Sequence, residues 1–134
     1  MDTLEQMQVK AFLNQARPET EIAQLTTSVT RLRGYLDIAR SMGADASGEG
    51  VERYAGLVKE YVGELEAHAA EVRAVISQVP NETQRRVLEC RYLDGMTIEQ
   101  TADRLSYCVK NINYHHRHAL ESVKSILDAS GIVL

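Results

Sequence analysis

The feature that most constrains the fold is a long run of apolar residues with helical spacing in the middle of the chain. Between residues 51 and 79, eight consecutive steps of three or four residues separate side chains that are apolar except for one histidine: Val51, Tyr54, Val58, Tyr61, Leu65, His68, Val72, Val75 and Val79. This spacing aligns the side chains on one face of an α-helix. Residues 22–39 have the same spacing, and the intervening residues 43–50 are rich in Gly, Ser, Ala and Asp. The pattern therefore predicts two long helices that fold back as an antiparallel hairpin.

A second apolar stripe lies beside the first on the later helix, and it consists of Ala55, Val62, Ala69 and Ile76. We expect the row of Tyr54, Val58, Tyr61 and Leu65 to face the helix of residues 22–39. The second stripe then needs another partner, and a second copy of the chain is the simplest one. We therefore expect a homo-oligomer formed through the N-terminal helices. The alternative is that a leading helix over residues 4–12, or the C-terminal part, covers this stripe within one chain.

Composition and prolines extend this prediction to the whole chain. Trp is absent, Phe occurs once and Pro twice among 134 residues, and good helix formers abound, so we predict an all-α fold without a sheet. Pro18 should break or kink the chain between the leading helix and the hairpin. Pro80 disfavours helix at the residue before it, and Asn81 can cap a following helix. We accordingly predict two domains, residues 1–79 as a coiled-coil-like helical hairpin and residues 80–134 as a separate module.

The C-terminal module has the pattern of a helix-turn-helix. Thr97 and Gln100 have the spacing of a capping box, which starts a short helix. Ala102 is small where two helices must approach closely, and Ile112 falls where a second helix would pack back on the first. The outer face of that second helix then carries donors that suit phosphates and base edges in the major groove, namely Lys110, Asn113, Tyr114 and Arg117.

The distribution of charge agrees with this assignment only locally. The net charge is −4, whereas DNA-binding proteins usually show a basic surface. From residue 81 onward, seven cationic residues balance seven acidic ones, so the acidic excess lies in the first 80 residues. Between Tyr107 and Lys124 there are three cationic residues, one acidic residue and three histidines. We therefore expect modest affinity for DNA unless several copies act together.

The string RRVLECRYLDGMTIEQTADRLSYCVKNINYHHRHAL resembles the sigma-70 region 4-like phage regulators, the group that includes the ArpU- and RinA-type late-gene activators. The resemblance implies a factor that binds promoter DNA and influences RNA polymerase. Three positions depart from the family pattern: Cys108 stands where Ser would cap the helix, Val109 where Arg is expected, and His115 where a leucine would pack. The predicted contacts with double-stranded DNA are Lys110, Asn113, Tyr114 and Arg117, the neighbouring Val109 and Asn111, and Arg85 and Arg86 as phosphate contacts.

Other classes of function lack support in the sequence. No phosphate-binding glycine loop, nucleophile motif or pair of catalytic carboxylates occurs, so we expect no enzyme and no cofactor. His115 and His118 lack partners that would complete a tetrahedral metal site. With no apolar run of membrane-spanning length, we expect a cytoplasmic protein. Three alternatives to a sequence-specific transcription regulator remain: a DNA-packaging oligomer like a small terminase, an adaptor that binds RNA polymerase without contacting DNA, and a scaffold.

Overall fold

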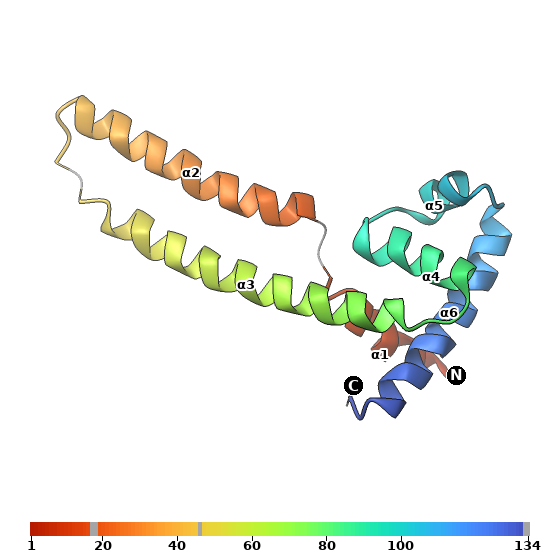
Figure 1. Cartoon of the computed structure of the whole chain (residues 1–134). Coiled ribbons are helices and arrows are strands. Elements are labelled where there is room, and N and C mark those ends of the chain that lie inside the picture. Colours follow the sequence, from red (N-terminus) through yellow and green to blue (C-terminus); the bar gives the residue numbers. More distant parts are fainter. Residues whose placement is uncertain (17–18, 46, 133–134) are drawn as a thin grey trace. The chain divides into compact units, whose positions relative to one another are not determined.

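The computed structural model describes residues 1–16, 19–45 and 47–132. All regular secondary structure in these residues is helical, which confirms the predicted all-α fold (Figure 1). The elements are α1 (Thr3–Leu13), α2 (Glu19–Ser41), α3 (Glu49–Ser77), α4 (Glu82–Leu88), the π-helical turn η1 (Glu89–Leu93), α5 (Ile98–Leu105) and α6 (Val109–Ala129). Among the described residues, no helix is both long and apolar enough to cross a membrane.

The chain divides into two compact units. Unit 1 contains residues 1–18 and 67–134, and unit 2 contains Glu19–Glu66. The helix α3 contributes its first part to unit 2 and its last part to unit 1. This division does not coincide with the boundary predicted between residues 79 and 80, because the N-terminal helix and the end of α3 group with the C-terminal helices.

A single large core explains why α1 belongs to unit 1. Buried apolar side chains from α1, the end of α3, α4, η1 and α6 form one cluster, whose fully buried members include Val9, Leu13, Val72, Ile76, Val79, Leu88, Leu120, Val123 and Leu127. Asp2 starts α1 with a capping box, in which its carboxylate accepts from the Glu5 amide at 2.8 Å. The predicted leading helix is therefore present, and it packs as part of the same core as α6.

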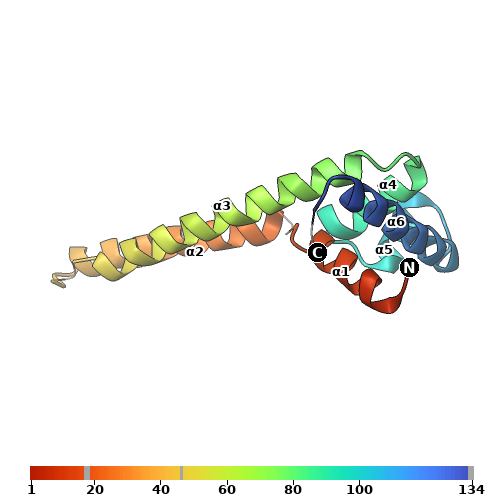
Figure 2. The ribbon, with the colours of Figure 1, turned by 90° about the horizontal axis from the view of Figure 1, so that it is seen from below.

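Unit 2 is a hairpin of two antiparallel helices, as predicted. The helix α2 and the first part of α3 lie side by side in both views (Figures 1 and 2). Arg33 on α2 forms a two-pronged ion pair with Glu52 on α3, with both N–O distances 3.0 Å. The loop predicted over residues 43–50 corresponds to the segment between Ser41 and Glu49. The break predicted near Pro18 falls between α1 and α2, although Pro18 itself lies outside the described residues.

The prediction of which stripe of α3 faces α2 was wrong in part. Ala55 and Val62 line the groove between the two helices together with Val58, whereas Tyr54 and Tyr61 are exposed. Tyrosines at such positions can bury part of the ring and keep the hydroxyl group in water. The rest of the second stripe, Ala69 and Ile76, is buried in the core of unit 1.

Candidate nucleic-acid interface

The first helix of the helix-turn-helix, α5, begins with the predicted capping box. The Thr97 hydroxyl accepts a hydrogen bond from the Gln100 amide at 3.1 Å, and the Gln100 side-chain oxygen accepts from the Thr97 amide at 2.9 Å. The buried Thr101 hydroxyl donates to the Thr97 carbonyl at 2.8 Å. The first two bonds satisfy backbone amides that would otherwise be free at the helix start, so they fix where α5 begins. The third satisfies the buried hydroxyl, since the Thr97 carbonyl also accepts from the Thr101 amide.

The turn that follows sets the direction of α6. Ser106 adopts the left-handed conformation with φ 60° and ψ 40°, and the Tyr107 amide donates to the Ala102 carbonyl at 3.0 Å. This arrangement closes α5 in the way that left-handed residues commonly end helices. Cys108 then occupies the N-cap of α6 and makes no side-chain hydrogen bond to the backbone, which agrees with the expectation that it is a weaker cap than Ser.

A small second core holds α4, α5 and α6 at fixed angles. Val87, Ala102 and Ile112, one from each helix, are buried against one another, and Ile98 and Leu105 pack around them. The Ser122 hydroxyl also donates to the Gln84 side-chain oxygen at 2.7 Å, which joins α6 to α4. Because Ile112 is on the buried side of α6, the residues about half a turn from it face outward.

The outward side of α6 brings together five of the eight predicted DNA-binding residues. An open depression of about 460 Å³ is lined by Val109, Lys110, Asn113, Tyr114 and Arg117. All five side chains are exposed, and so is the sixth predicted residue of this helix, Asn111. The depression therefore presents an ammonium, a guanidinium, an amide and a phenol next to one apolar side chain. These groups can donate to phosphates and to base edges and can contact a thymine methyl.

Aromatic and imidazole rings extend this surface along α6, and of these only Tyr114 was predicted from the sequence as a DNA contact. Tyr114 contacts His118 edge to face with ring centroids 4.4 Å apart, and His115 lies 5.4 Å from both Tyr107 and Tyr114. The Arg117 guanidinium lies 6.0 Å from the centre of the Tyr114 ring. The spacing of four between Tyr114 and His118 was the available signal, because side chains at that spacing meet on a helix. Packing against these neighbours restrains the Tyr114 ring.

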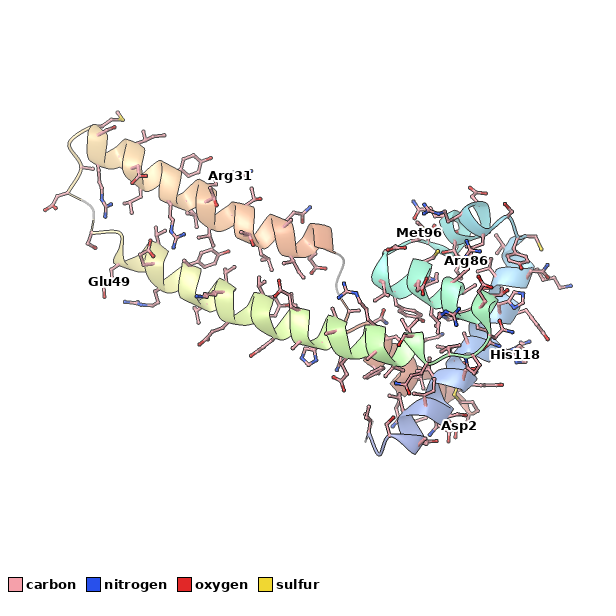
Figure 3. The ribbon with its side chains drawn as sticks, viewed as in Figure 1. Asp2, Arg31, Glu49, Arg86, Met96 and His118 are labelled. Carbon is pink, nitrogen blue, oxygen red and sulfur yellow. The ribbon has the colours of Figure 1, made fainter. Side chains whose placement is uncertain are left out.

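The two arginines of α4 differ in their surroundings. The Arg85 guanidinium donates to the Val79 carbonyl at 2.9 Å, so it stabilises the connection between α3 and α4. Arg86 is exposed on α4 (Figure 3). Of the two predicted phosphate contacts, Arg86 therefore has the freer side chain. Arg85 could contact a phosphate only through an N–H group of its guanidinium that does not donate to the Val79 carbonyl.

On the buried side of α6, a histidine and a tyrosine connect this helix to η1. The Tyr92 hydroxyl and His116 Nε2 are 2.7 Å apart, and the two rings stack with centroids 5.7 Å apart. Burial, with a smaller contribution from the cations Lys10 and Arg91, lowers the pKa of His116 to about 4. Burial also raises the pKa of Tyr92 to about 12. Both groups are therefore neutral at pH 7, and they support α6 without adding charge to it.

The widened turn η1 is tied to the loop that precedes α5. The Arg91 guanidinium donates to the Met96 carbonyl at 2.5 Å, and the Met96 amide donates to the Cys90 carbonyl at 2.9 Å. These bonds close the loop and so help to position α5. No local sequence pattern predicted this π-helical turn.

Comparison with protein families agrees with this geometry. Residues 81–125 match the family model described as Sigma-70, region 4. These residues form a sigma-70 region 4-like helix-turn-helix domain. The matched segment begins at Asn81, which caps α4 by accepting from the Gln84 amide at 3.0 Å, and ends within α6. Comparisons with curated proteins and with solved structures find no match. The match supports a DNA-binding, transcription-related role for this domain.

Proposed function

We propose that this protein is a sequence-specific DNA-binding transcription regulator that contacts duplex DNA through the outer side of α6. The observation that supports the proposal most strongly is the depression lined by Lys110, Asn113, Tyr114, Arg117 and Val109, on the second helix of a sigma region 4-like domain. In helix-turn-helix proteins the second helix enters the major groove, which is wide enough for it.

Each residue of this surface has a role that follows from its chemistry. Lys110 and Arg117 are cations that pair with phosphates or with guanine, and Asn113 has the amide that bonds two positions of adenine. Val109, at the first turn of α6, can contact a thymine methyl. Arg86, exposed on α4, adds a phosphate contact at the edge of the interface. Because the cations that can contact phosphate are few, the affinity should be modest, and its log–log slope with salt should be about −0.9 for each phosphate contacted.

Selection of binding sites from random duplexes with the full chain tests the proposal. We expect a recurrent sequence of a few base pairs, bound by the native protein at about 50 mM salt and much more weakly at about 200 mM. As a control, Lys59→Ala removes a positive charge from an exposed lysine of unit 2, and it should leave the affinity for DNA unchanged. Recovery of no sequence preference, together with rings of several copies, would instead indicate a DNA-packaging oligomer of the small-terminase kind.

The regulator we propose is of the sigma-like kind that phages and prophages encode, and RNA polymerase is its second partner. The resemblance of residues 81–125 to sigma region 4 supports that partner. Polymerase capture by a chain that has no affinity for any duplex would identify an adaptor instead. We further propose that the chain acts as a homo-oligomer formed through its N-terminal helices, which places two copies of α6 on one DNA site.

A further inference from the structure

Unit 2 has very little core of its own. Among its described residues, the only buried apolar side chains are Val29 and Leu65. The groove between α2 and α3 has a volume of about 440 Å³, and it is lined partly by the small or polar residues Thr26, Thr30, Ala55 and Gly63. A helix of this length is stabilised mainly by burial of an apolar face. The hairpin therefore needs more apolar burial than its two helices give each other.

Large apolar side chains are available for that burial on the outside of the hairpin. Tyr35 and Leu57 are each 61% exposed, and Tyr61 is 45% exposed. Leu32 on α2 and Tyr54 on α3 are also exposed. Within each helix these residues are three or four positions apart, so each helix carries one continuous exposed stripe. We call the two stripes together, Leu32, Tyr35, Tyr54, Leu57 and Tyr61, the apolar face.

The two stripes lie on the same side of the hairpin. On α3, Tyr54, Leu57 and Tyr61 each come directly before a residue that lines the groove: Ala55, Val58 and Val62. On α2, Leu32 likewise comes directly before the groove residue Arg33. One residue corresponds to a rotation of about 100° about the helix axis. Because the helices are antiparallel, the same rotation in each turns both stripes toward the same side.

The opposite side of the hairpin has a different composition. The residues one position after Val29, Val58 and Val62 are Thr30, Lys59 and Gly63, which are small or polar and line the groove where it opens on this side. Gly34 and Gly56 directly follow the groove residues Arg33 and Ala55. An added Cβ at Gly34, Gly56 or Gly63 would meet no atom within 4 Å, so these glycines are not needed for close approach inside the chain. The two sides of the hairpin thus differ in composition, and Ile38 and Met42 are the other large exposed apolar residues among the described residues of α2 and the loop after it.

We propose that a second copy of this chain docks on the apolar face, so that two hairpins stack into a four-helix bundle with a two-fold axis. With about 200 Å² for each large side chain, the exposed part of the apolar face amounts to roughly 500 Å². A homodimer interface of roughly 800 Å² per partner is roughly 65% apolar, so the apolar face supplies about the apolar area that such an interface needs. Two-fold stacking buries the same residues on both copies.

The apolar face has no alternative occupant in the N-terminal helix. The buried side of α1, which includes Val9, Phe12 and Leu13, packs in the core of unit 1 with α6. The side of α1 with the largest buried residues is therefore already used, and of the large apolar residues on that helix only Leu4 and Met7 remain exposed. Three of the five residues of the apolar face are tyrosines, which are enriched at protein interfaces because they bury a ring and keep a hydroxyl at the wet rim. A second copy brings an identical, complementary surface.

The consequence for DNA rests on the proposed function. A two-fold bundle carries two copies of α6, so a dimeric site should contain inverted half-sites about one helical turn apart or a multiple of it. A duplex with one half-site should bind one α6, with lower affinity. Dimerisation and DNA contact are then separable properties, because the apolar face lies in unit 2 and the DNA-contacting surface lies in unit 1.

Light scattering coupled to size exclusion, on the full chain at tens of micromolar, tests the proposal. The native chain should have twice the chain mass of 15.0 kDa. Tyr35→Glu and Leu57→Glu should each weaken dimerisation at least tenfold and yield monomers at that concentration. Thr27→Glu is the matched control, an exposed position on α2 two turns before Tyr35, and it should leave the dimer intact.

Two further readouts separate the possible causes of failure. Circular dichroism and binding to a single half-site should be preserved in both glutamate variants, which shows that unit 1 remains folded. A native chain of 15.0 kDa, or variants that remain dimeric, would overturn the proposal. Dimerisation without affinity for any duplex would support the docked second copy and refute the proposed function.

Discussion

Leu13 lies on α1, far along the chain from the helix-turn-helix, yet it is fully buried in the same core as α6. Replacing Leu13 with alanine should therefore destabilise the DNA-binding unit itself. If the domain began at Pro80, it would not include α1, and the substitution would leave the stability of α6 unchanged. The substitution thus tests which residues fold together with α6.

The size of the effect follows from the burial of this side chain. Leu→Ala removes three carbon atoms, which are worth about 0.8 kcal/mol each when fully buried. The cavity that remains adds to this cost, so the free energy of unfolding should fall by about 3–4 kcal/mol. For a unit of this size, the total free energy of unfolding is roughly 4–13 kcal/mol. A large share of its stability should therefore disappear.

Hydrogen exchange of α6 peptides across a urea series, measured on the full chain, reports the stability of unit 1. Leu4→Ala is the matched control, because Leu4 is on the same helix and is 63% exposed. We expect the control to change the free energy of unfolding by less than about 0.5 kcal/mol. If Leu13→Ala changes the stability of α6 as little as the control does, α1 does not belong to the folding unit of α6.

Two other properties follow from the site. The pKa of His116 is about 4 in the folded protein against an ordinary 6.5, so the unfolded chain binds the proton first as the pH falls. The contribution of His116 to the free energy of unfolding should be complete above pH 6.5 and should decline between pH 6.5 and 4 by up to about 1.4 kcal/mol per pH unit. Urea midpoints at pH 7 and 5 should show this decline, and His116→Gln should reduce it. At the start of α5, Thr97→Ala should lower the free energy of unfolding by about 1 kcal/mol, because it removes the capping box. At the start of α6, Cys108→Ser should raise the melting temperature by supplying the missing cap, and a lower melting temperature would contradict the cap assignment.

The sequence was sufficient for features that depend on local spacing. The helices of unit 2, the capping box at Thr97 and the burial of Ala102 and Ile112 all follow from residues that lie within a few positions of one another. The outward position of Lys110, Asn113 and Arg117 follows in turn from the burial of Ile112, because a helix fixes the angle between them.

Features that depend on which faces meet could not be predicted in this way. Two neighbouring stripes of α3 differ by only about 100° of rotation, and periodicity does not say which one a partner covers. In the structure Ala55 and Val62 line the groove beside α2, whereas Tyr54 and Tyr61 are exposed. The packing of α1 against α6 joins segments from opposite ends of the chain, and no local sequence pattern predicts such a contact.

Whether the outer side of α6 binds duplex DNA can be decided by fluorescence anisotropy of the triple variant Lys110→Ala, Asn113→Ala, Arg117→Ala. With a duplex recovered by selection, we expect the triple variant to bind without sequence preference. Its affinity should also depend less steeply on salt, by about 0.9 in the log–log slope for each phosphate that the variant no longer binds. Circular dichroism should be unchanged, because all three side chains are exposed. A correctly folded triple variant that binds the same duplex with native affinity and native salt dependence would exclude this side of α6 as the DNA-binding surface.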